Sequence, residues 1–376
     1  MSKFIGIYGG AFDPPHLSHI NTAKALIEER GYDKLILLPS HNPPHKLLSA
    51  NDYDRLCMLK LIESDKMEVS DLEIKRQGIG YTVDYLPDII AKYGDNIEYI
   101  IGGDSFLNFD KWYKPLEILK LVSIVVVARD GEREKLYTKL AEYENIPKKG
   151  ITIAKYMPDS MSSSDIRNKL RLHLPVQDLL DSKVAEYIKN NNLYNEYGAL
   201  VETLKANISE ERFLHTLRVV MYALKFVDKL KLDYNKVFIA SLLHDCAKNN
   251  INYDYIYNNK LVPLDSKNTP IAHAFCGSIV AREKYGITDT EILDAIFCHS
   301  TAKPNMTNLA KLVYSADMLE EGRDFDGVVK LREIFEKDFG RGFIACLEKT
   351  CEHLQKENKE IYPLTIDAYN YYKSKK

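Results

Sequence analysis

The first half of the chain alternates short apolar runs with longer segments of mixed polarity. Apolar runs of this length, rich in β-branched residues, predict buried strands, which we place at 4–8, 34–39, 98–101 and 123–128. The segments 21–30 and 50–64 predict amphipathic helices. Strands that alternate with helices indicate an α/β fold with a doubly wound parallel sheet, in which ligands bind at the carboxyl ends of the strands.

The pattern becomes helical after about residue 195. Apolar residues then recur at three- and four-residue spacing, at Phe213, Leu217, Val220, Leu224 and Val227. We expect no strand from there to the C-terminus. A length of 376 residues is typical of two domains. We therefore predict an α/β domain over residues 1–195 and an all-α domain over residues 199–376.

Composition excludes several classes of protein. Charged residues make up 28% of the chain and the net charge is −3, which argues against binding of nucleic acid by the whole surface. The longest apolar run, 121–128, is far shorter than the roughly 20 residues of a membrane span. The N-terminus has no signal-peptide pattern. The six cysteines lack CxxC spacing, so we expect free thiols and a cytoplasmic protein with no membrane partner.

The ten histidines are unevenly distributed, and four of them fall within the first 45 residues. The segment GGAFDPPHLSH, residues 9–19, directly follows the first predicted strand. Its two glycines allow the backbone to turn sharply and to approach a ligand closely. His16 and His19 then lie at the start of a helix, where imidazole donors and backbone N–H groups can meet phosphate oxygens. The segment therefore predicts a phosphate-binding site.

This segment resembles the signature of the cytidylyltransferase-like nucleotidyltransferases, which have a Rossmann-like fold, and most nearly that of bacterial nicotinate-nucleotide adenylyltransferases. Ser18 stands where the family usually has glycine. Further matching segments follow in the family's order, at 39–46, 81–84, 102–105 and 161–167, together with Trp112. The resemblance implies catalytic roles for His16, His19, Lys46 and Arg167. It implies substrate contacts for Gly9, Gly10, Phe12, Asp13, Thr82, Gly103, Asp104, Trp112, Ser163 and Ser164.

The chemistry implied by this resemblance is adenylyl transfer from ATP, with Mg²⁺, to nicotinate mononucleotide. The products would be deamido-NAD and pyrophosphate, and the protein would supply positioning and charge neutralisation without a nucleophile of its own. A pantetheine-phosphate adenylyltransferase is the alternative for this half. Tyr81, Thr82 and Trp112 favour the nicotinate enzyme, because an aromatic ring suits a flat pyridine.

The second half carries dispersed histidines and carboxylates that would meet only in a folded domain. In chain order they are His215, the pair His244-Asp245, His273, His299 and Asp317. His244 and Asp245 end an apolar helix, where polar side chains need partners. Imidazole nitrogen and carboxylate oxygen together suit iron, manganese or zinc.

This order resembles the HD superfamily of metal-dependent phosphohydrolases, and more closely the YqeK-type bacterial proteins, which hydrolyse diadenosine tetraphosphate symmetrically to two ADP. The resemblance implies an Fe or Mn ion held by His215, His244, Asp245 and Asp317, with Asp245 also catalytic. It implies phosphate contacts from Arg212, Lys248, His273, His299, Ser300 and Arg323. Ser300 replaces the family's usual threonine and keeps the hydroxyl. His273 and His299 would orient phosphate or protonate the leaving group.

Two alternatives remain for the helical half. It could hydrolyse another nucleotide, such as an alarmone or a nucleoside monophosphate, or it could bind a nucleotide without turnover and regulate the first half. The complete set of predicted ligands favours an enzyme. The expected partners are small nucleotides, namely ATP, nicotinate mononucleotide and diadenosine tetraphosphate, and a homo-oligomer is compatible with the sequence.

Overall fold

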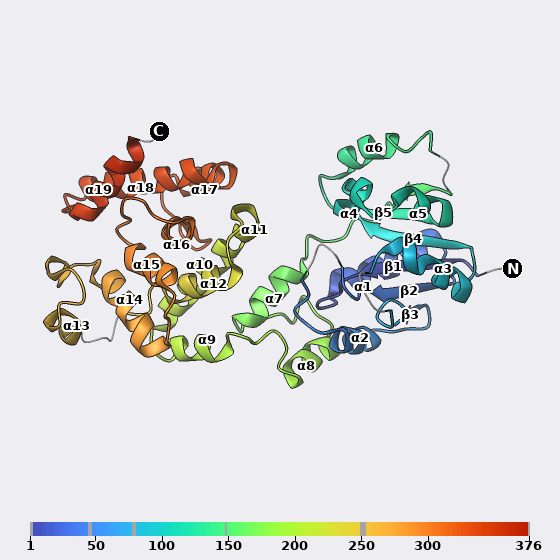
Figure 1. Cartoon of the computed structure of the whole chain (residues 1–376), viewed down its shortest axis with the longest axis horizontal. Helices are drawn as coiled ribbons and strands as arrows, with labels where there is room; N and C mark the ends of the chain where they lie inside the picture. The colour runs from blue at the N-terminus through green and yellow to red at the C-terminus, as the bar shows by residue number, and fades with distance from the viewer. Residues whose placement is uncertain (1–2, 44–46, 77–79, 147–148, 249–252, 375–376) are drawn as a thin grey trace. The chain divides into compact units, whose positions relative to one another are not determined.

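The computed structural model describes residues 3–43, 47–76, 80–146, 149–248 and 253–374. The chain divides into two compact units, Met1–Glu196 and Tyr197–Lys376 (Figure 1). Lys46 lies outside the described residues, so its phosphate contact stays a prediction. No helix of the described part is long and apolar enough to cross a membrane.

The first unit is built on a six-stranded parallel sheet with the strand order β3-β2-β1-β4-β5-β6. The strands are β1 (Ile5–Gly10), β2 (Lys34–Pro39), β3 (Met67–Val69), β4 (Ile97–Gly102), β5 (Ser123–Val127) and β6 (Ile151–Ile153). The predicted α/β fold with a parallel sheet is confirmed. The sequence pattern missed β3 and β6, because three residues are too few to show a period.

Helices cover both faces of this sheet (Figure 1). They are α1 (Leu17–Arg30), α2 (Asp52–Lys60), α3 (Thr82–Tyr93), α4 (Gly103–Leu107), α5 (Pro115–Leu121), α6 (Arg133–Ala141), α7 (Ser163–Arg171) and α8 (Ser182–Asn190). Side chains that alternate along a strand enter separate cores: Leu35 and Leu37 pack with α1, whereas Ile36 and Leu38 pack with α3. This two-sided burial explains why the strands are apolar throughout.

Two helix boundaries differ from the prediction. α1 begins at Leu17, four residues earlier than expected, because His16 in extended conformation serves as its N-cap. α2 begins at Asp52, where the Asn51 side chain accepts a hydrogen bond of 2.9 Å from the Asp54 N–H. The earlier start of α1 places both His16 and His19 in its first turn.

The described residues of the second unit form helices joined by turns and loops, with no strand among them, and the predicted all-α fold is confirmed. Its helices are α9 (Gly198–Lys205), α10 (Glu210–Leu224), α11 (Val227–Leu230), α12 (Tyr234–Leu243), α13 (Asp254–Asn258), α14 (Ala272–Tyr285), α15 (Thr290–Cys298), α16 (Asn308–Leu319), α17 (Val328–Lys337), α18 (Phe339–Lys356) and α19 (Pro363–Lys373). All six cysteines of the chain are free, and five of them are buried.

Candidate active sites

The glycine turn after β1 is pressed against its surroundings. A Cβ atom at Gly9 would collide with the Tyr99 hydroxyl, and one at Gly10 would lie 3.1 Å from the Phe12 ring. Phe12 has a positive φ of 48° and is 1% exposed, packed against the rings of Tyr8 and His19. The glycines therefore allow the turn to pack closely against Tyr99 and Phe12. Phe12, which we expected to touch substrate, supports the turn from inside.

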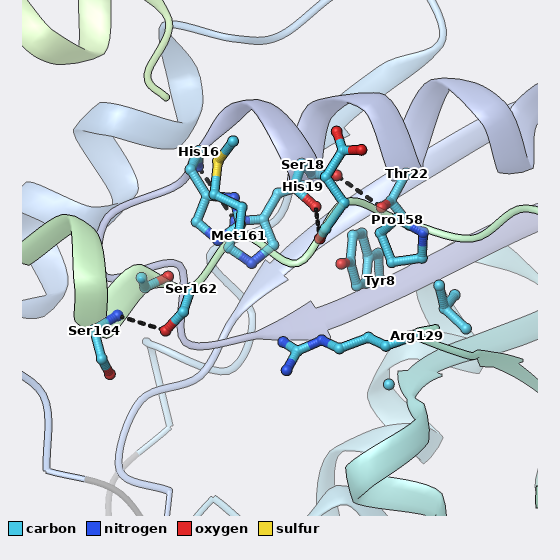
Figure 2. A pocket seen from close by; sticks show the side chains of 14 residues that line it. Tyr8, His16, Ser18, His19, Thr22, Arg129, Pro158, Met161, Ser162 and Ser164 are labelled. Carbon is cyan, nitrogen blue, oxygen red and sulfur yellow. Dashed lines mark hydrogen bonds between the residues drawn. The ribbon is translucent and has the colours of Figure 1, made fainter. Parts of the chain in front are cut away.

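His16 and His19 lie together at the start of α1. Their rings stack with centroids 3.7 Å apart, and the His16 N–H donates to His19 Nδ1 over 3.2 Å. Both line a cavity of about 180 Å³ (Figure 2). The remaining lining residues are Tyr8, Ser18, Thr22, Gly102, Val127, Arg129, Pro158, Asp159, Met161 and Ser162–Ser164. The structure thus brings the two histidines and the predicted serines to one cavity.

The opposite wall of this cavity is the N-terminus of α7. Ser162 caps the helix by accepting a 3.2 Å hydrogen bond from the Ser164 N–H. The first backbone N–H groups of a helix carry partial positive charge and suit an anion. Arg129, at the carboxyl end of β5, adds a full positive charge, and its side chain is half exposed (Figure 2). We missed Arg129 in the sequence, although an arginine directly after a buried strand was a usable signal.

Asp13 and Arg167 face away from the cavity. The Asp13 carboxylate is fully buried and accepts hydrogen bonds from the N–H groups of Ser49 and Ala50 and from the Tyr194 hydroxyl. Arg167 donates to the Asp13 carbonyl oxygen over 2.6 Å and to Ser164 Oγ over 3.1 Å. In this arrangement both side chains hold the loops around the site. Neither residue lines this cavity or the next, and the ligand contacts predicted for them stay predictions.

A second cavity, of about 630 Å³, lies beside the first and shares Gly102 with it. Trp112 lines it and packs on Phe109 with ring centroids 5.2 Å apart. The rings of Tyr81 and Tyr113 pack 4.7 Å apart in the same wall. Gly9, Gly10, Thr82, Lys111 and Lys114 also line this cavity. Gly103 and Asp104 line neither cavity, and Asp104 instead pairs with Arg129 at 3.5 Å.

Glu73 is a buried carboxyl in the wall of the larger cavity, and the sequence reasoning missed it. It is 3% exposed, and Oε1 accepts a 3.1 Å hydrogen bond from the His41 N–H. A Cβ atom at Gly80 would lie 2.5 Å from the same oxygen. Glu73 therefore bridges the loop after β2 and the loop before α3. Burial raises the pKa of Glu73 from 4.5 to about 7.

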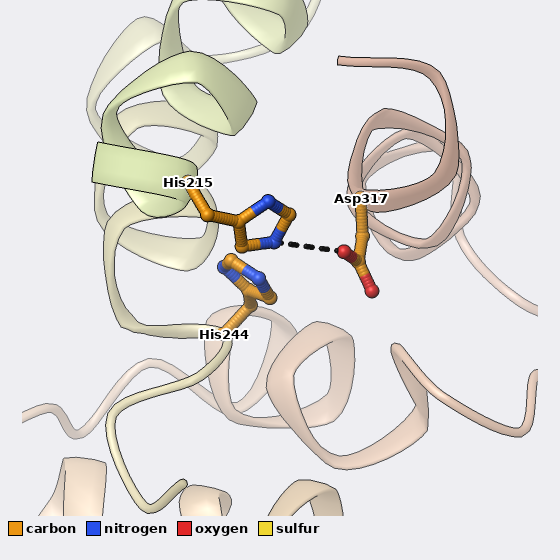
Figure 3. A group of neighbouring side chains, drawn as sticks. All are labelled: His215, His244 and Asp317. Carbon is orange, nitrogen blue, oxygen red and sulfur yellow. Dashed lines mark ion pairs between the residues drawn. The ribbon is translucent and has the colours of Figure 1, made fainter. Parts of the chain in front are cut away.

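In the second unit, the predicted metal ligands converge from separate helices. His215 lies on α10, His244 and Asp245 follow α12, and Asp317 lies on α16. Candidate ligand atoms of His215, His244 and Asp317 lie within 4.8 Å of one another, as do those of His244, Asp245 and His299. Figure 3 shows the side chains of His215, His244 and Asp317 pointing toward a common centre.

The tautomers of the buried histidines test whether a metal fits this site. Nδ1 of His244, His273 and His299 each donates over 2.7 Å to the carbonyl oxygen three residues earlier. Because Nδ1 is the donor to these carbonyl groups, Nε2 is the nitrogen that can present a lone pair to a metal. All three Nε2 atoms lie within 3.2–3.5 Å of the Asp245 carboxylate, which is 1% exposed. Acceptor atoms that face one another at this distance fit a shared cation.

Two further observations agree with a metal. His215 Nε2, His244 Nε2 and Asp245 Oδ1 are buried and lack a hydrogen-bond partner among the described residues, although His215 Nε2 lies 2.9 Å from Asp317 Oδ1. Burial lowers the pKa of His244 to about 4, against weaker opposing effects of Asp245 and Asp317. His244 is therefore neutral at pH 7, as a metal ligand must be.

Burial lowers the pKa of His273 as well. The role of His273 as an acid that protonates the leaving group, which the resemblance implies, stays a prediction. Ser300 Oγ lies between the two rings, 3.2 Å from His273 Nε2 and 3.1 Å from His299 Nε2.

The predicted phosphate-binding cations surround this centre. Arg212 Nη1 lies 2.8 Å from Asp245 Oδ2, and Lys248 Nζ lies 3.7 Å from the same oxygen. Arg323 Nη2 donates over 2.6 Å to Asp317 Oδ1. Among the described residues the structure thus gathers all ten residues predicted for the second site, and every cation in this set contacts a carboxylate that the sequence predicts as a metal ligand.

Comparisons with known proteins agree with both units. A family model described as cytidylyltransferase-like matches residues 7–169, and one described as an HD domain matches residues 212–322. A protein of Mycoplasma genitalium named probable nicotinate-nucleotide adenylyltransferase/Ap4A hydrolase is 30% identical over 333 residues, which cover 86% of this chain and 89% of that protein.

Two further relatives each match one half. A probable nicotinate-nucleotide adenylyltransferase of Borreliella burgdorferi is 40% identical over 196 residues, covering 50% of this chain and 96% of that protein. The crystal structure of a predicted HD superfamily hydrolase from Clostridium acetobutylicum is 33% identical, covers 48% of this chain and 98% of that chain, and has a TM-score of 0.46. The chain therefore belongs to the family of the Mycoplasma genitalium protein, with an N-terminal cytidylyltransferase-like domain and a C-terminal HD domain.

Proposed function

We propose that the N-terminal unit transfers the adenylyl group of ATP to nicotinate mononucleotide, giving deamido-NAD and pyrophosphate. The observation that carries this proposal is the pair of adjoining cavities at the carboxyl end of the sheet. One is lined by His16, His19 and Arg129, and the other by Trp112 and two tyrosines. The names of the relatives from Mycoplasma and Borreliella support the same activity.

In this reaction a phosphate oxygen of the mononucleotide forms a bond to the α-phosphorus of ATP. The bond from that phosphorus to the bridging oxygen breaks in line, and pyrophosphate leaves with Mg²⁺. His16, His19, Arg129 and the N-terminus of α7 would neutralise the triphosphate. The aromatic cavity would hold the pyridine ring and bring its phosphate into line.

The test is to supply ATP and Mg²⁺ with nicotinate mononucleotide, nicotinamide mononucleotide or phosphopantetheine, and to measure pyrophosphate and the dinucleotide product. The proposal predicts turnover chiefly with nicotinate mononucleotide. Turnover with phosphopantetheine instead would identify the N-terminal unit as a pantetheine-phosphate adenylyltransferase. Turnover with none of the three would refute adenylyl transfer to these acceptors.

For the C-terminal unit, we infer metal-dependent, symmetrical hydrolysis of diadenosine tetraphosphate to two ADP, with Fe or Mn as the metal. The observation that carries it is the buried Asp245 carboxylate, which faces three Nε2 lone pairs and two cations. His215, His244, Asp245 and Asp317 would hold the metal. When bound, such a metal lowers the pKa of its water and polarises the phosphorus–oxygen bond.

The chain's own residues would bind and orient the polyphosphate. Arg212, Lys248 and Arg323 lie where they can exchange a carboxylate contact for a phosphate contact as the metal neutralises the carboxylates. Ser300 Oγ can donate a hydrogen bond at the same place. Since both proposed reactions use soluble nucleotides, we also infer a cytoplasmic location and no nucleic-acid partner.

Incubation of the full chain with diadenosine tetraphosphate and Mn²⁺ or Fe²⁺ tests the second activity. The proposal predicts ADP as sole product and loss of the activity in Asp245→Ala. Formation of AMP and ATP would refute symmetrical cleavage. Binding of the dinucleotide without any product would favour the regulatory alternative, and turnover of an alarmone or a nucleoside monophosphate alone would identify a different substrate.

A further inference from the structure

Glu320 is a buried glutamate that contacts His215, one of the proposed metal ligands. It is 1% exposed and lies directly after α16, three residues beyond Asp317. Its Oε1 accepts a 3.1 Å hydrogen bond from His215 Nδ1. Its Oε2 accepts hydrogen bonds of 2.7 Å from Arg218 Nε and 2.5 Å from the Gly322 N–H.

The contact with His215 fixes which nitrogen of that ring faces the glutamate. A carboxylate only accepts, so His215 Nδ1 donates to Glu320, and Nε2 is the nitrogen left to face a metal. That Nε2 atom lies 2.9 Å from Asp317 Oδ1 and belongs to the candidate ligand group with His244 and Asp317. His215 differs here from the other three histidines, whose Nδ1 atoms donate to backbone carbonyl groups of their own segments.

The same carboxylate ties two elements together. His215 and Arg218 lie on α10, whereas Glu320 and Gly322 lie in the turn that follows α16. A Cβ atom at Gly322 would lie 2.5 Å from Arg218 Nε, so glycine leaves room for the guanidinium group. Burial alone would raise the pKa of Glu320, but the hydrogen bonds from Arg218, Gly322 and His215 together lower it.

We propose that Glu320 is the positioning residue of the metal site, which holds the His215 ring with its Nε2 lone pair toward the metal. This inference rests on the proposed metal-dependent function of the C-terminal unit. A carboxylate behind an imidazole ligand fixes its orientation and raises its basicity, and loss of such a partner typically costs about 10- to 100-fold in metal affinity.

The experiment is a calorimetric titration of the metal-free full chain with Mn²⁺. Asp245→Ala defines the binding that belongs to this site. We expect Glu320→Gln to weaken Mn²⁺ binding about tenfold and Glu320→Ala to weaken it up to roughly 100-fold. Glu321→Gln is the matched control, because Glu321 is adjacent, exposed and paired with Lys225 on the surface. Its affinity should stay within about twofold of the wild type.

Thermal unfolding of the metal-free variants separates positioning from simple support of the fold. A Glu320→Gln chain with lowered unfolding temperature and Mn²⁺ affinity within twofold of the wild type would overturn the inference. If Glu320→Ala does not fold, the nearly isosteric Glu320→Gln decides. A wild-type chain that binds no more Mn²⁺ than Asp245→Ala would overturn both this inference and the proposed metal-dependent function.

Discussion

At the scale of single residues, burial sets the charge state of groups in both units. Burial raises the pKa of Glu73, beside the aromatic cavity, to about 7. It lowers the pKa of His244, in the proposed metal site, to about 4. In each case desolvation disfavours the charged form. These shifts make the stability of each unit depend on pH in a calculable direction.

Glu73→Gln should stabilise the N-terminal unit increasingly as pH rises. The folded pKa of Glu73, about 7, lies above its ordinary 4.5, so its contribution is complete below about pH 4.5 and is lost as pH rises through 7. Glutamine cannot ionise, so the gap in unfolding free energy between variant and wild type should grow between pH 5 and pH 8, by up to about 3 kcal/mol.

Urea unfolding followed by the fluorescence of Trp112 measures this gap. Trp112 is the single tryptophan of the chain, so the signal reports on the N-terminal unit. Glu117→Gln, at a half-exposed site paired with Lys120, is the control and should show no such trend. A gap that does not change with pH would contradict the prediction.

His19→Ala should reduce adenylyl transfer by about 10²- to 10³-fold, because one donor to the developing charge is lost. His173→Asn is a control within the same unit: His173 lines neither cavity, and asparagine tolerates its φ of 54°. Steady-state rates with ATP and nicotinate mononucleotide measure both variants. Equal rates for His19→Ala and the wild type would show that His19 does not contribute to adenylyl transfer.

The sequence identified residues with distinctive local neighbours, such as the two histidines after the glycine turn and the His244-Asp245 pair. It missed Glu73 and Glu320, whose roles depend on contacts with distant segments. The Glu320 contact with His215, for example, spans 105 positions of the chain. A single sequence contains no signal for such pairs. Arg129 was missed as well, although its place directly after a predicted strand was a local signal.

At the scale of elements, the long periodic segments were predictable and the short ones were not. The strands at 34–39 and 123–127 and the helices after residue 200 carry enough apolar positions to show their period. β3 and β6 form by pairing with β2 and β5, which already exist as buried strands. Their three residues each take an extended conformation because a neighbour offers hydrogen bonds, so local preference does not determine them.

Packing of α17 against α18 requires Gly342. A Cβ atom there would collide with the Phe335 Cα atom and lie 2.7 Å from its Cβ atom, and a helix backbone cannot move aside cheaply. Gly342→Ala should therefore destabilise the C-terminal unit by about 1–3 kcal/mol. Gly340→Ala in the same helix meets only Asp338 Oδ1, at 3.5 Å, and should be neutral or slightly stabilising.

Differential scanning calorimetry of the full chain distinguishes these two variants. Trp112 lies in the N-terminal unit. The unfolding transition of the C-terminal unit is therefore the one at whose temperature Trp112 fluorescence does not change. Equal shifts in the unfolding temperature of this transition for the two substitutions would contradict the prediction that close packing of α17 against α18 requires Gly342.

For the molecule as a whole, we expect the two units to differ in the metal that they need. The N-terminal site would use Mg²⁺ carried by ATP, whereas the C-terminal site presents its own buried ligands. After treatment with a chelator, we expect Mg²⁺ alone to restore adenylyl transfer, and Mn²⁺ or Fe²⁺ to be required for hydrolysis of the dinucleotide. Recovery of hydrolysis by Mg²⁺ alone would contradict the preference that nitrogen ligands imply.

We infer that this one chain holds two separate active sites. The most direct measurement assays both reactions in wild type, His16→Ala and Asp245→Ala, with products separated by chromatography. We predict that His16→Ala loses dinucleotide synthesis and still forms ADP from diadenosine tetraphosphate, while Asp245→Ala shows the reverse. If either substitution abolishes both reactions in a folded chain, or if wild type forms no ADP, the assignment of one activity to each unit is wrong.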